Sequence, residues 1–399
     1  MAHIHLCWEL GGGLGHAGRL KMLAQALLAR GHRVTISLRD LMHTHALLAD
    51  LDVLKLQAPV WLHETVGLTA PASLAEILFR CGYLEPSALR GVTAGWRDLF
   101  TLLQPDLVVA DFAPTALLAA RSLGLRSASV GNGFNSPPPG EPLPALRTTP
   151  MERLAASEAR MLASANAVLA EYGAPAYANG AEIFLGELPL LCTWPELDHW
   201  GRGQGPGPWL GPNFVADGGI APHWPEGEGA RVYAYLKASH GAHATVLRAL
   251  VDEGCRVLAY VPEVAAGAQP PVNSERIVYA EAPLALQPTL AAADLCVCHA
   301  GEGTLAQSLL AGVPLLMLPS HAEQFLSARS VALSGAGYNA ASPSTDWRVV
   351  VRRLLDDPAY RHAARAFAAR HRDFNQRRMN EQLALLLEEH LAGPGDVPR

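Results

Sequence analysis

A histidine near the N-terminus stands where it could act as a general base. An apolar stretch is followed by Gly11-Gly12-Gly13-Leu14-Gly15-His16, and residues at helical spacing come next. Imidazole takes up a proton near neutral pH, and a carboxylate on its second nitrogen fixes the tautomer and stabilises the imidazolium. Asp111 ends a later apolar run, so a parallel sheet would bring it to the same edge. We predict that His16 is a base oriented by Asp111, although a helix-capping or solvent-exposed histidine would have the same local sequence.

Small and polar residues open a helix in the second half of the chain. An apolar run ends at Cys298, and His299-Ala300-Gly301-Glu302-Gly303-Thr304 follows it. Backbone amides at a helix start favour an anion, so this segment suits a diphosphate. Glu323 and Gln324 follow the next apolar run and could bind sugar hydroxyls. Acidic residues are also common at helix starts as caps, which is the alternative for this pair.

The glycine turn has a competing interpretation as a dinucleotide-binding turn. Gly13, Gly15 and Gly18 match the spacing of the dinucleotide fingerprint, and Asp40 could be its acidic partner. That interpretation predicts an NAD-dependent oxidoreductase. It leaves the polar cluster between 299 and 324 without a role, so we rank it below a reaction that uses both halves of the chain.

The elements that must position these residues alternate between strands and helices in both halves. Such alternation is typical of parallel sheets with helices on their faces. We therefore predict an α/β protein with two Rossmann-like parallel-sheet domains that face a cleft. The expected N-terminal domain comprises residues 1–210, with a helix at about 375–391 packing back on it, and the C-terminal domain comprises residues 211–374.

Composition argues against several classes of protein. The net charge is −6 and no basic face stands out, which argues against nucleic-acid binding. The six cysteines are scattered and no carboxylate pair suits a metal, so we expect no metal site and a reducing compartment. No segment has the ~18–20 apolar residues of a membrane span, and the stretch at 4–10 is too interrupted for a signal peptide. We expect a cytoplasmic protein, at most peripheral to a membrane through its arginine-rich C-terminal helices, whose arginines otherwise form a solvated face.

Two irregular segments could hold an acceptor. The alternation weakens between 58 and 103, where aromatic residues accumulate, and the segment 131–144 contains three consecutive prolines. Long irregular insertions on a sheet scaffold are often functional loops, although plain surface loops would look alike. The acceptor-binding candidates from the glycine turn and these segments are Gly15, Trp61, Phe79 and Asn135.

The run from His299 to Gln324 closely resembles the donor-binding signature of family-1, UDP-glycosyltransferase-like enzymes of the GT-B fold. The matching positions are His299, Gly301, Thr304, Gly312-Val313-Pro314, Pro319 and Glu323-Gln324. The glycine turn ending in His16, with Asp111 on a later strand, looks like the catalytic pair of the same family. The resemblance covers both halves of the chain. It implies a bacterial-type enzyme that moves a hexose or deoxyhexose from a nucleotide sugar to an acceptor.

The resemblance also implies roles for single residues. His16 would deprotonate the acceptor, a small molecule, a lipid or a glycan, and Asp111 would hold the imidazole. The diphosphate would be held by His299 and nearby amides, the sugar by Glu323 and Gln324, and the base would face Ala282. The donor-binding candidates are Ser239, Ala282, His299, Gly301, Glu302, Gly303, Thr304, Gln307, Glu323 and Gln324. The nucleotide sugar is a cosubstrate, and the resemblance implies no cofactor and no metal.

Two positions sharpen the expected chemistry. The family often has a glutamate for the ribose hydroxyls where this chain has Gln307, and Ala306-Gln307 is similar to bacterial rhamnosyltransferases that use dTDP-sugars. The expected donor is therefore a dTDP- or UDP-sugar. Retaining enzymes of this architecture usually carry two glutamates eight residues apart, but Leu310 stands eight residues after Glu302, which favours inversion. A sugar-nucleotide hydrolase or epimerase on the same fold, or a non-catalytic sensor of such donors, is the alternative.

Overall fold

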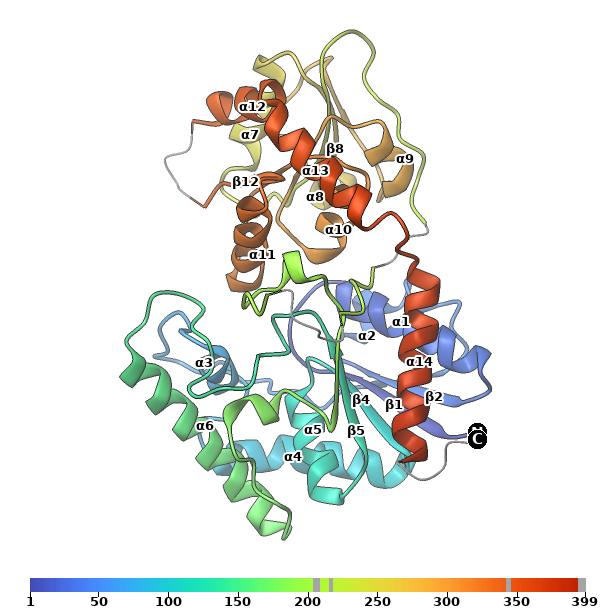
Figure 1. Ribbon diagram of the computed structural model, residues 1–399, viewed down its shortest axis with the longest axis vertical. Helices are drawn as coiled ribbons and strands as arrows, with labels where there is room; N and C mark the ends of the chain where they lie inside the picture. The colour runs from blue at the N-terminus through green and yellow to red at the C-terminus, as the bar shows by residue number, and fades with distance from the viewer. Residues whose placement is uncertain (204–208, 215–217, 342–345, 394–399) are drawn as a thin grey trace. The chain divides into compact units, whose positions relative to one another are not determined.

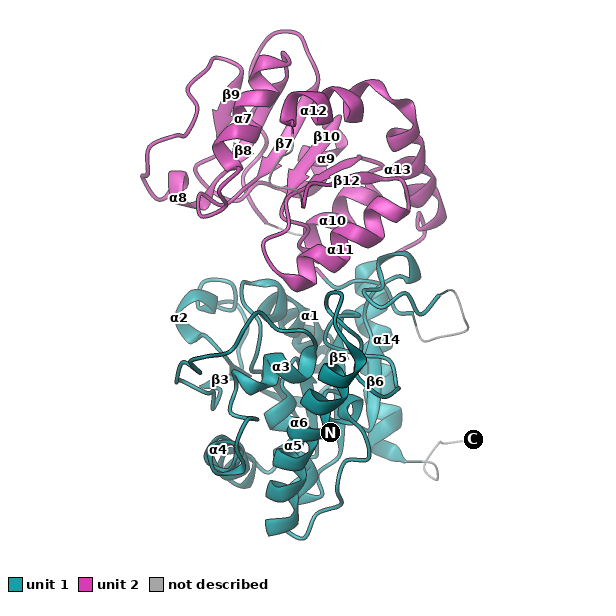
Figure 2. Ribbon diagram, turned by 90° about the vertical axis from the view of Figure 1, so that its left-hand side faces the viewer, with its two compact units in different colours: residues 1–213, 375–399 teal, residues 214–374 magenta. Residues whose placement is uncertain are grey.

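The structure is a computed structural model that describes residues 1–203, 209–214, 218–341 and 346–393 (Figure 1). The chain divides into two compact units, which Figure 2 distinguishes by colour. Unit 1 comprises residues 1–213 and 375–399, and unit 2 comprises residues 214–374. The helix expected to pack back on the N-terminal domain is thus part of unit 1.

Unit 1 is built on a six-stranded sheet in the order β3-β2-β1-β4-β5-β6, and every neighbouring pair is parallel. Its strands are β1 His3–Trp8, β2 Arg33–Leu38, β3 Leu54–Gln57, β4 Leu107–Asp111, β5 Ser127–Gly131 and β6 Leu188–Leu191. The strand order reverses between β1 and β4, and doubly wound sheets bind ligands beyond the carboxyl ends of their strands at such a switch point. Trp8 pairs with Asp111 there, so the loops after β1 and β4 begin side by side.

Two groups of helices pack around this sheet. The helices α4, α5 and α6 contact one another, and α1 contacts α14 (Figure 1). The helical segments of unit 1 are α1 Gly15–Ala29, α2 Leu41–Thr44, α3 Leu74–Phe79, α4 Pro86–Leu103, α5 Pro114–Leu123, α6 Met151–Glu171, the short 3₁₀ turns Gly180–Ile183 and Pro195–Leu197, and α14 Gln376–Ala392. Glu388 of α14 accepts hydrogen bonds of 2.7 Å from Arg30 and His32, which fastens this helix beside α1.

Unit 2 repeats the same topology. Its sheet has the order β12-β11-β10-β7-β8-β9, again with parallel neighbours. The strands are β7 Arg231–Tyr235, β8 Arg256–Tyr260, β9 Ile277–Tyr279, β10 Leu295–Cys298, β11 Leu315–Met317 and β12 Gly337–Asn339. The helices are α7 His243–Asp252, α8 Pro262–Ala265, α9 Leu286–Ala291, α10 Glu302–Leu310, α11 Ala322–Leu333, α12 Trp347–Asp356 and α13 Pro358–Arg370. The switch point of this sheet lies between β7 and β10.

The inner strands are buried along their whole length. Every residue of β1, β4 and β10 is buried, as expected of parallel strands that are covered on both faces. The expected α/β class with two parallel sheets is therefore confirmed. Among the described residues, no helix is both long and apolar enough to cross a bilayer.

Candidate active site

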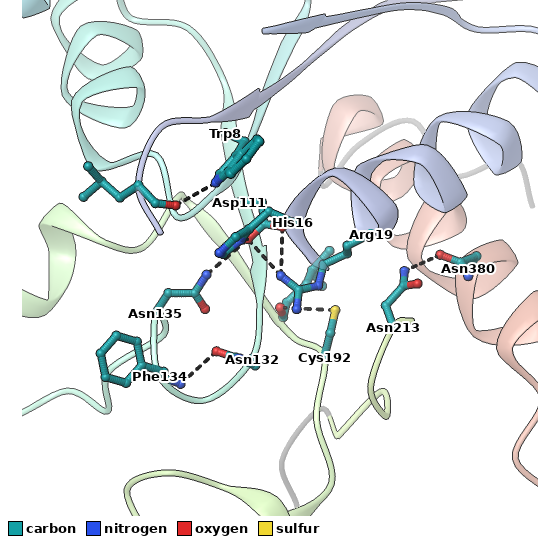
Figure 3. A network of polar contacts seen from close by, with 12 residues as sticks. Trp8, His16, Arg19, Asp111, Asn132, Phe134, Asn135, Cys192, Asn213 and Asn380 are labelled. Atoms are coloured by element: carbon teal, nitrogen blue, oxygen red, sulfur yellow. Dashed lines mark hydrogen bonds and ion pairs between the residues drawn. The ribbon is translucent and has the colours of Figure 1, made fainter. Parts of the chain in front are cut away.

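His16 is the second residue of α1, and its side chain reaches the end of β4. Its Nδ1 is 2.9 Å from Oδ1 of Asp111, the last residue of that strand (Figure 3). The Asp111 side chain is fully buried, whereas 12% of the His16 side chain is exposed. The structure thus brings together two residues that stand 95 positions apart in the sequence.

The glycine turn makes room for the imidazole. Gly11 has a φ of +84°, and a Cβ built on it would lie 2.5 Å from Nε2 of His16. A side chain at this position would therefore displace the imidazole as well as strain the backbone. Trp8 stacks on the His16 ring with centroids 5.5 Å apart and planes 18° from parallel, and the Phe112 centroid lies 6.3 Å away. One bare glycine and two aromatic rings thus define where the imidazole sits.

Asp111 has two further partners that the sequence analysis did not assign to it. Nη1 of Arg19 is 2.9 Å from Oδ1 and 2.8 Å from Oδ2, and Nδ2 of Asn135 is 3.2 Å from Oδ1. Burial alone would raise the pKa of Asp111, but the charges and hydrogen bonds of Arg19 and His16 outweigh it and lower that pKa. Asp111 is therefore an ionised, fixed hydrogen-bond acceptor at neutral pH.

The contact with Asp111 fixes which nitrogen of His16 carries the proton. An ionised carboxylate only accepts hydrogen bonds, so Nδ1 donates and Nε2 keeps a lone pair. In the part of the chain that the structure describes, Nε2 has no hydrogen-bond partner. A hydroxyl that approached Nε2 could transfer its proton there, and Asp111 would stabilise the imidazolium that forms. This geometry is compatible with the predicted role of His16 as a general base.

Asn135 reaches Asp111 from the buried loop that follows β5. Two glycines let this loop pass close to other groups: a Cβ on Gly131 would lie 2.2 Å from Oδ1 of Asn135, and one on Gly133 would lie 2.5 Å from Oδ1 of Asp198. Nδ2 of Asn135 donates to Asp111, and only 5% of the residue is exposed. Its expected contact with an acceptor stays a prediction.

Two other carboxylates of this region have structural partners. Glu9 follows β1, is buried, and accepts the N–H of Thr115 at the start of α5 at 2.8 Å. Burial raises the pKa of Glu9 to about 7, against the hydrogen bonds from Thr115 that lower it. Asp40, the acidic residue of the dinucleotide interpretation, caps α2 by accepting the His43 N–H at 2.9 Å. That interpretation thus relies on a carboxylate already engaged as a helix cap.

In unit 2, His299 follows β10, and both of its ring nitrogens are hydrogen bonded to backbone groups. The Lys237 N–H donates to Nε2 at 2.8 Å, and Nδ1 is 2.8 Å from the carbonyl oxygen of Leu318. Because Nε2 accepts, Nδ1 carries the proton and the ring is neutral. Burial lowers the pKa of His299, which favours the same state. A direct contact with a diphosphate would require one of these bonds to be exchanged, so that role stays a prediction.

The helix α10 opens directly after this loop with the expected small residues. Gly301 is the N-cap, Glu302 is the first helical residue, and Gly303 and Thr304 complete the first turn. Ala300 has a φ of +62°, a left-handed conformation that costs a non-glycine residue roughly 1–3 kcal/mol. A glycine N-cap has no side chain to accept from the first amides, which suits a helix start that binds an anion.

Two donor candidates are hydrogen bonded within their own segments. Gln307 donates through Nε2 to the carbonyl oxygen of Gly303 at 3.1 Å, and Gln324 accepts the N–H of Ser320 through Oε1 at 2.9 Å. These amide groups would have to exchange the local bonds to bind a ribose or a sugar through the same atoms. The other donor candidates are Ser239, exposed after β7, Ala282, half-buried after β9, and Glu323, half-buried in the first turn of α11.

The acceptor candidates differ in exposure. Trp61 is half-buried and makes an edge contact with His63, with centroids 5.0 Å apart. Phe79 ends α3 and is only 7% exposed, which leaves little of its ring for an acceptor. Gly15 is exposed at the first position of α1, next to His16. Gly15 thus adjoins His16, whereas Phe79 contributes to the core of unit 1.

Arg19 is the residue of this site that sequence reasoning missed. It stands three residues after His16 on α1, and residues at this spacing share a helix face. That spacing was the available signal, because a cation on the face that carries a base is placed to reach the same carboxylate. The identity of its partner depended on where β4 ends, which only the fold shows.

Comparisons with known proteins add to this geometry. Residues 246–373 match the family described as erythromycin biosynthesis protein CIII-like, C-terminal domain. The chain is 42% identical over 72 residues to the elloramycin glycosyltransferase ElmGT of Streptomyces olivaceus, a match that spans 18% of each protein. It is 23% identical over 389 residues, 90% of each protein, to an uncharacterized glycosyltransferase of Methanosarcina acetivorans.

A solved structure shares the fold over nearly the whole chain. The glycosyltransferase SsfS6 of Streptomyces sp. SF2575, complexed with thymidine diphosphate, matches with a TM-score of 0.64 at 20% identity, and the match covers 98% of this chain and 100% of that chain. Two six-stranded parallel sheets with flanking helices are the GT-B architecture of such enzymes, which confirms the expected fold. Together these findings show that the chain has the GT-B fold and is similar to bacterial glycosyltransferases of the family-1 type.

Proposed function

We propose that this protein is an inverting, metal-independent glycosyltransferase that moves a hexose or deoxyhexose from a nucleotide sugar to an acceptor hydroxyl. The observation that carries the proposal is the 2.9 Å contact of His16 Nδ1 with the buried Asp111 carboxylate, which leaves the Nε2 lone pair to take a proton. One base is what a single displacement needs. The acceptor would attack the anomeric carbon from the face opposite the leaving group and invert its configuration.

The proposed step moves one proton and exchanges one glycosidic bond. The acceptor hydroxyl gives its proton to Nε2 of His16 while its oxygen bonds to the anomeric carbon. The bond from that carbon to the diphosphate oxygen breaks, and its electron pair leaves with the nucleoside diphosphate. Asp111 stabilises the imidazolium, which then returns its proton to solvent. The backbone amides at the start of α10 are the proposed stabilisers of the charge that develops on the diphosphate.

We propose a dTDP-sugar as the donor, with a UDP-sugar as the alternative. Gln307 provides a neutral amide where the resemblance would place a glutamate for the ribose hydroxyls, and charge-assisted hydrogen bonds are roughly twice as strong as neutral ones. A deoxyribose has no 2′-hydroxyl and loses less from this exchange. The structural neighbour SsfS6 was crystallised with thymidine diphosphate, which supports the same choice.

The first test is thermal unfolding in the presence of dTDP-, UDP- and GDP-sugars and of NAD(H), since a ligand of the native state raises the midpoint. The expected result is a larger shift with dTDP-rhamnose or dTDP-glucose than with the matching UDP-sugar. Gln307→Glu should reduce the difference between the shifts with dTDP- and UDP-sugars several-fold, because a carboxylate would accept a hydrogen bond from the ribose hydroxyls of UDP. Stabilisation by NAD(H) alone would replace this proposal with the oxidoreductase.

The mechanism is tested on the product. NMR of the transferred sugar should give an anomeric configuration opposite to that of the donor, and retention would contradict a single displacement. Among the described residues, no group of three or more His, Cys, Asp or Glu is arranged to hold a metal ion. Excess EDTA should therefore leave the transfer rate unchanged. Release of free sugar at the same rate with and without acceptors would favour the hydrolase.

The partners of the proposed reaction are the nucleotide sugar and a small-molecule, lipid or glycan acceptor. The half-buried Trp61 offers an apolar surface in unit 1 that suits an acceptor with a flat or hydrophobic body. Fractionation of cells that express the protein should recover it with the cytoplasm, as proposed from the sequence, and recovery with washed membranes would point to a lipid acceptor.

A further inference from the structure

We propose that Arg19 is a positioning residue for the reaction of His16, because it holds the Asp111 carboxylate in place and offsets its charge. The inference rests on the proposed role of His16 as a base and adds a residue that the resemblance did not single out. With Arg19 in place, His16 faces an ion pair rather than an isolated buried carboxylate. An isolated carboxylate would favour the imidazolium more strongly, and the imidazolium cannot accept a proton.

The contacts of Arg19 bridge both oxygens of the carboxylate. Its Nη1 is 2.9 Å from Oδ1 and 2.8 Å from Oδ2, while Nδ1 of His16 is 2.9 Å from the same Oδ1. The side chains of Arg19 and Asp111 are 5% and 0% exposed. Water screens such a pair poorly, so each charge acts strongly on its neighbours. A rotation of the carboxylate away from Arg19 would also misalign His16.

The groups that face the carboxylate come from two elements besides its own strand (Figure 3). α1 contributes His16 and Arg19, and the loop after β5 contributes the neutral amide of Asn135. The charges that lower the pKa of Asp111 are those of Arg19 and His16. Figure 3 places the thiol of Cys192 beside Arg19. Both side chains whose charges lower the pKa of Asp111 therefore belong to α1.

Apart from Asp111, the groups that the described residues place against the imidazole do not titrate. Trp8 of β1 and Phe112 after β4 contribute aromatic rings, and Gly11 contributes backbone. The carboxylate of Glu9, one residue after Trp8, is turned to the N-terminus of α5 instead. A change in the protonation of His16 on removal of Arg19 therefore reports the charge of Arg19 itself.

The sign of the expected effect follows from these contacts. Loss of the Arg19 charge removes a repulsion on the imidazolium and exposes it to the full charge of Asp111. Both effects favour the protonated form of His16, whereas the reaction needs the neutral form. The acidic limb of the pH–rate profile should therefore move to higher pH by about one unit, the lower end of what a nearby charge produces.

The test compares Arg19→Gln, which keeps a donor without the charge, with Arg19→Lys, which keeps the charge. The rate at which dTDP-rhamnose is hydrolysed to dTDP and rhamnose is measured against pH. Water is used as the acceptor because it does not titrate in this range. In parallel, the His16 imidazole of the full chain is titrated by NMR without substrate. This second readout separates the proposal on Arg19 from the proposed function, since it gives a result even if no transfer is detected.

In Arg19→Gln, we expect both the acidic limb of the pH–rate profile and the midpoint of the His16 titration to move to higher pH. In Arg19→Lys, both should return towards the wild-type values. Arg202→Gln is the matched control, because Arg202 donates to the buried Asp198 in the same unit and does not contact Asp111. It should leave the midpoint unmoved. An unmoved midpoint in Arg19→Gln would overturn the proposal and reduce Arg19 to a structural ion pair.

A second variant covers the case in which Arg19→Gln does not fold. Arg19→Gln with Asp111→Asn replaces the buried ion pair by two amides and leaves no buried charge without a partner. Both charges that act on the imidazole are then absent. The midpoint of the His16 titration should therefore lie below that of the wild type. A midpoint as high as that of the wild type would contradict the electrostatic role of the pair.

Discussion

The two switch points of this molecule have the same strand topology but use histidine differently. In unit 1, His16 commits one nitrogen to a buried carboxylate and keeps the other for a proton. In unit 2, His299 commits both nitrogens to backbone groups, the N–H of Lys237 and the carbonyl oxygen of Leu318. His16 thus keeps one ring nitrogen open to a proton, whereas His299 joins three loops through backbone hydrogen bonds.

The backbones of the two switch points also share a feature. The residue after Asp111 is Phe112 with a φ of +48°, and the residue after His299 is Ala300 with a φ of +62°. A left-handed non-glycine residue in such a turn is strained and persists because its surroundings hold it. The same sharp turn thus follows Asp111 in unit 1 and precedes the start of α10 in unit 2. Similar topology fixes where a side chain lies, and its partners decide what it does.

The largest expected effect tests whether unit 1 holds the base. His16→Ala should lower kcat by about 10²–10⁴-fold, the usual contribution of a general base, with little change in dTDP affinity. His43→Ala is the matched control, because His43 also contacts an aspartate, Asp40 at 2.6 Å, but is 69% exposed. It should leave kcat unchanged. An equal loss in both variants, or a loss of dTDP binding in His16→Ala, would break the comparison.

The second prediction compares the first strands of the two sheets by their acid sensitivity. β1 carries His5, fully buried against Thr35 and Ser37, whereas β7 has no histidine. Burial and then the charge of His3 lower the pKa of His5 from 6.5 to about 3. The unfolded chain therefore takes up a proton below about pH 6.5 that the folded chain refuses until about pH 3. Between pH 7 and 4.5 this should remove roughly 2–3 kcal/mol of unfolding free energy.

The measurement is urea unfolding of the wild type and His5→Gln at several pH values. The raised pKa of Glu9, about 7, acts in the opposite sense, because the folded chain binds that proton first and loses stability as pH rises from 4.5 to 7. Only the difference between the two proteins isolates His5. That difference should shrink as the pH falls, and a constant difference would contradict the assignment of acid sensitivity to β1.

The third prediction tests whether the glycine turn of unit 1 is shaped by the imidazole. Gly11→Ala and Gly13→Ala both place a side chain at a φ above +80°, +84° and +82° respectively, so both carry similar backbone strain. Only the Cβ on Gly11 would collide with Nε2 of His16, at 2.5 Å, while the Cβ on Gly13 would meet nothing within 4 Å. Gly11→Ala should lose about tenfold to a hundredfold more activity, as a misplaced catalytic group does. Equal losses would show that strain alone matters.

The comparison also shows what the sequence could and could not predict. The apolar runs that end near Trp8, Asp111 and Cys298 predicted the inner strands, because strands buried on both faces read as continuous apolar segments. The edge strands of unit 1 were not recognised: β3 at 54–57 is half-exposed, and β6 contains Pro189. β3 alternates apolar and polar residues and so lacks the continuous apolar pattern of the inner strands, and a proline inside β6 argues against a strand.

Among the site residues, the pairing of His16 with Asp111 was accessible because parallel strands bring their carboxyl ends to one edge. The contact of Asn135 with Asp111 was not, since it depends on the path of a loop after a neighbouring strand. The partners of His299 are backbone groups 62 and 19 residues away, and backbone groups have no identity in the sequence. Side-chain chemistry was therefore easier to predict than the hydrogen bonds that position it.

The smallest expected effect tests whether His299 stabilises the loops that it joins through its hydrogen bonds. His299→Gln should leave the Lys237 N–H or the Leu318 carbonyl without its partner, at a cost of about 1–3 kcal/mol of unfolding free energy. The loop after β10 would then hold dTDP less well, by about tenfold if a similar energy is lost on binding. Calorimetric titration with dTDP measures the affinity, and His362→Gln, an exposed histidine on α13, is the control. The acidic limb of the pH–rate profile should stay where it is, because burial lowers the pKa of His299 and backbone groups occupy both of its ring nitrogens. A limb that moved with His299 would assign the titrating group to unit 2 and reverse the division of roles between the two switch points.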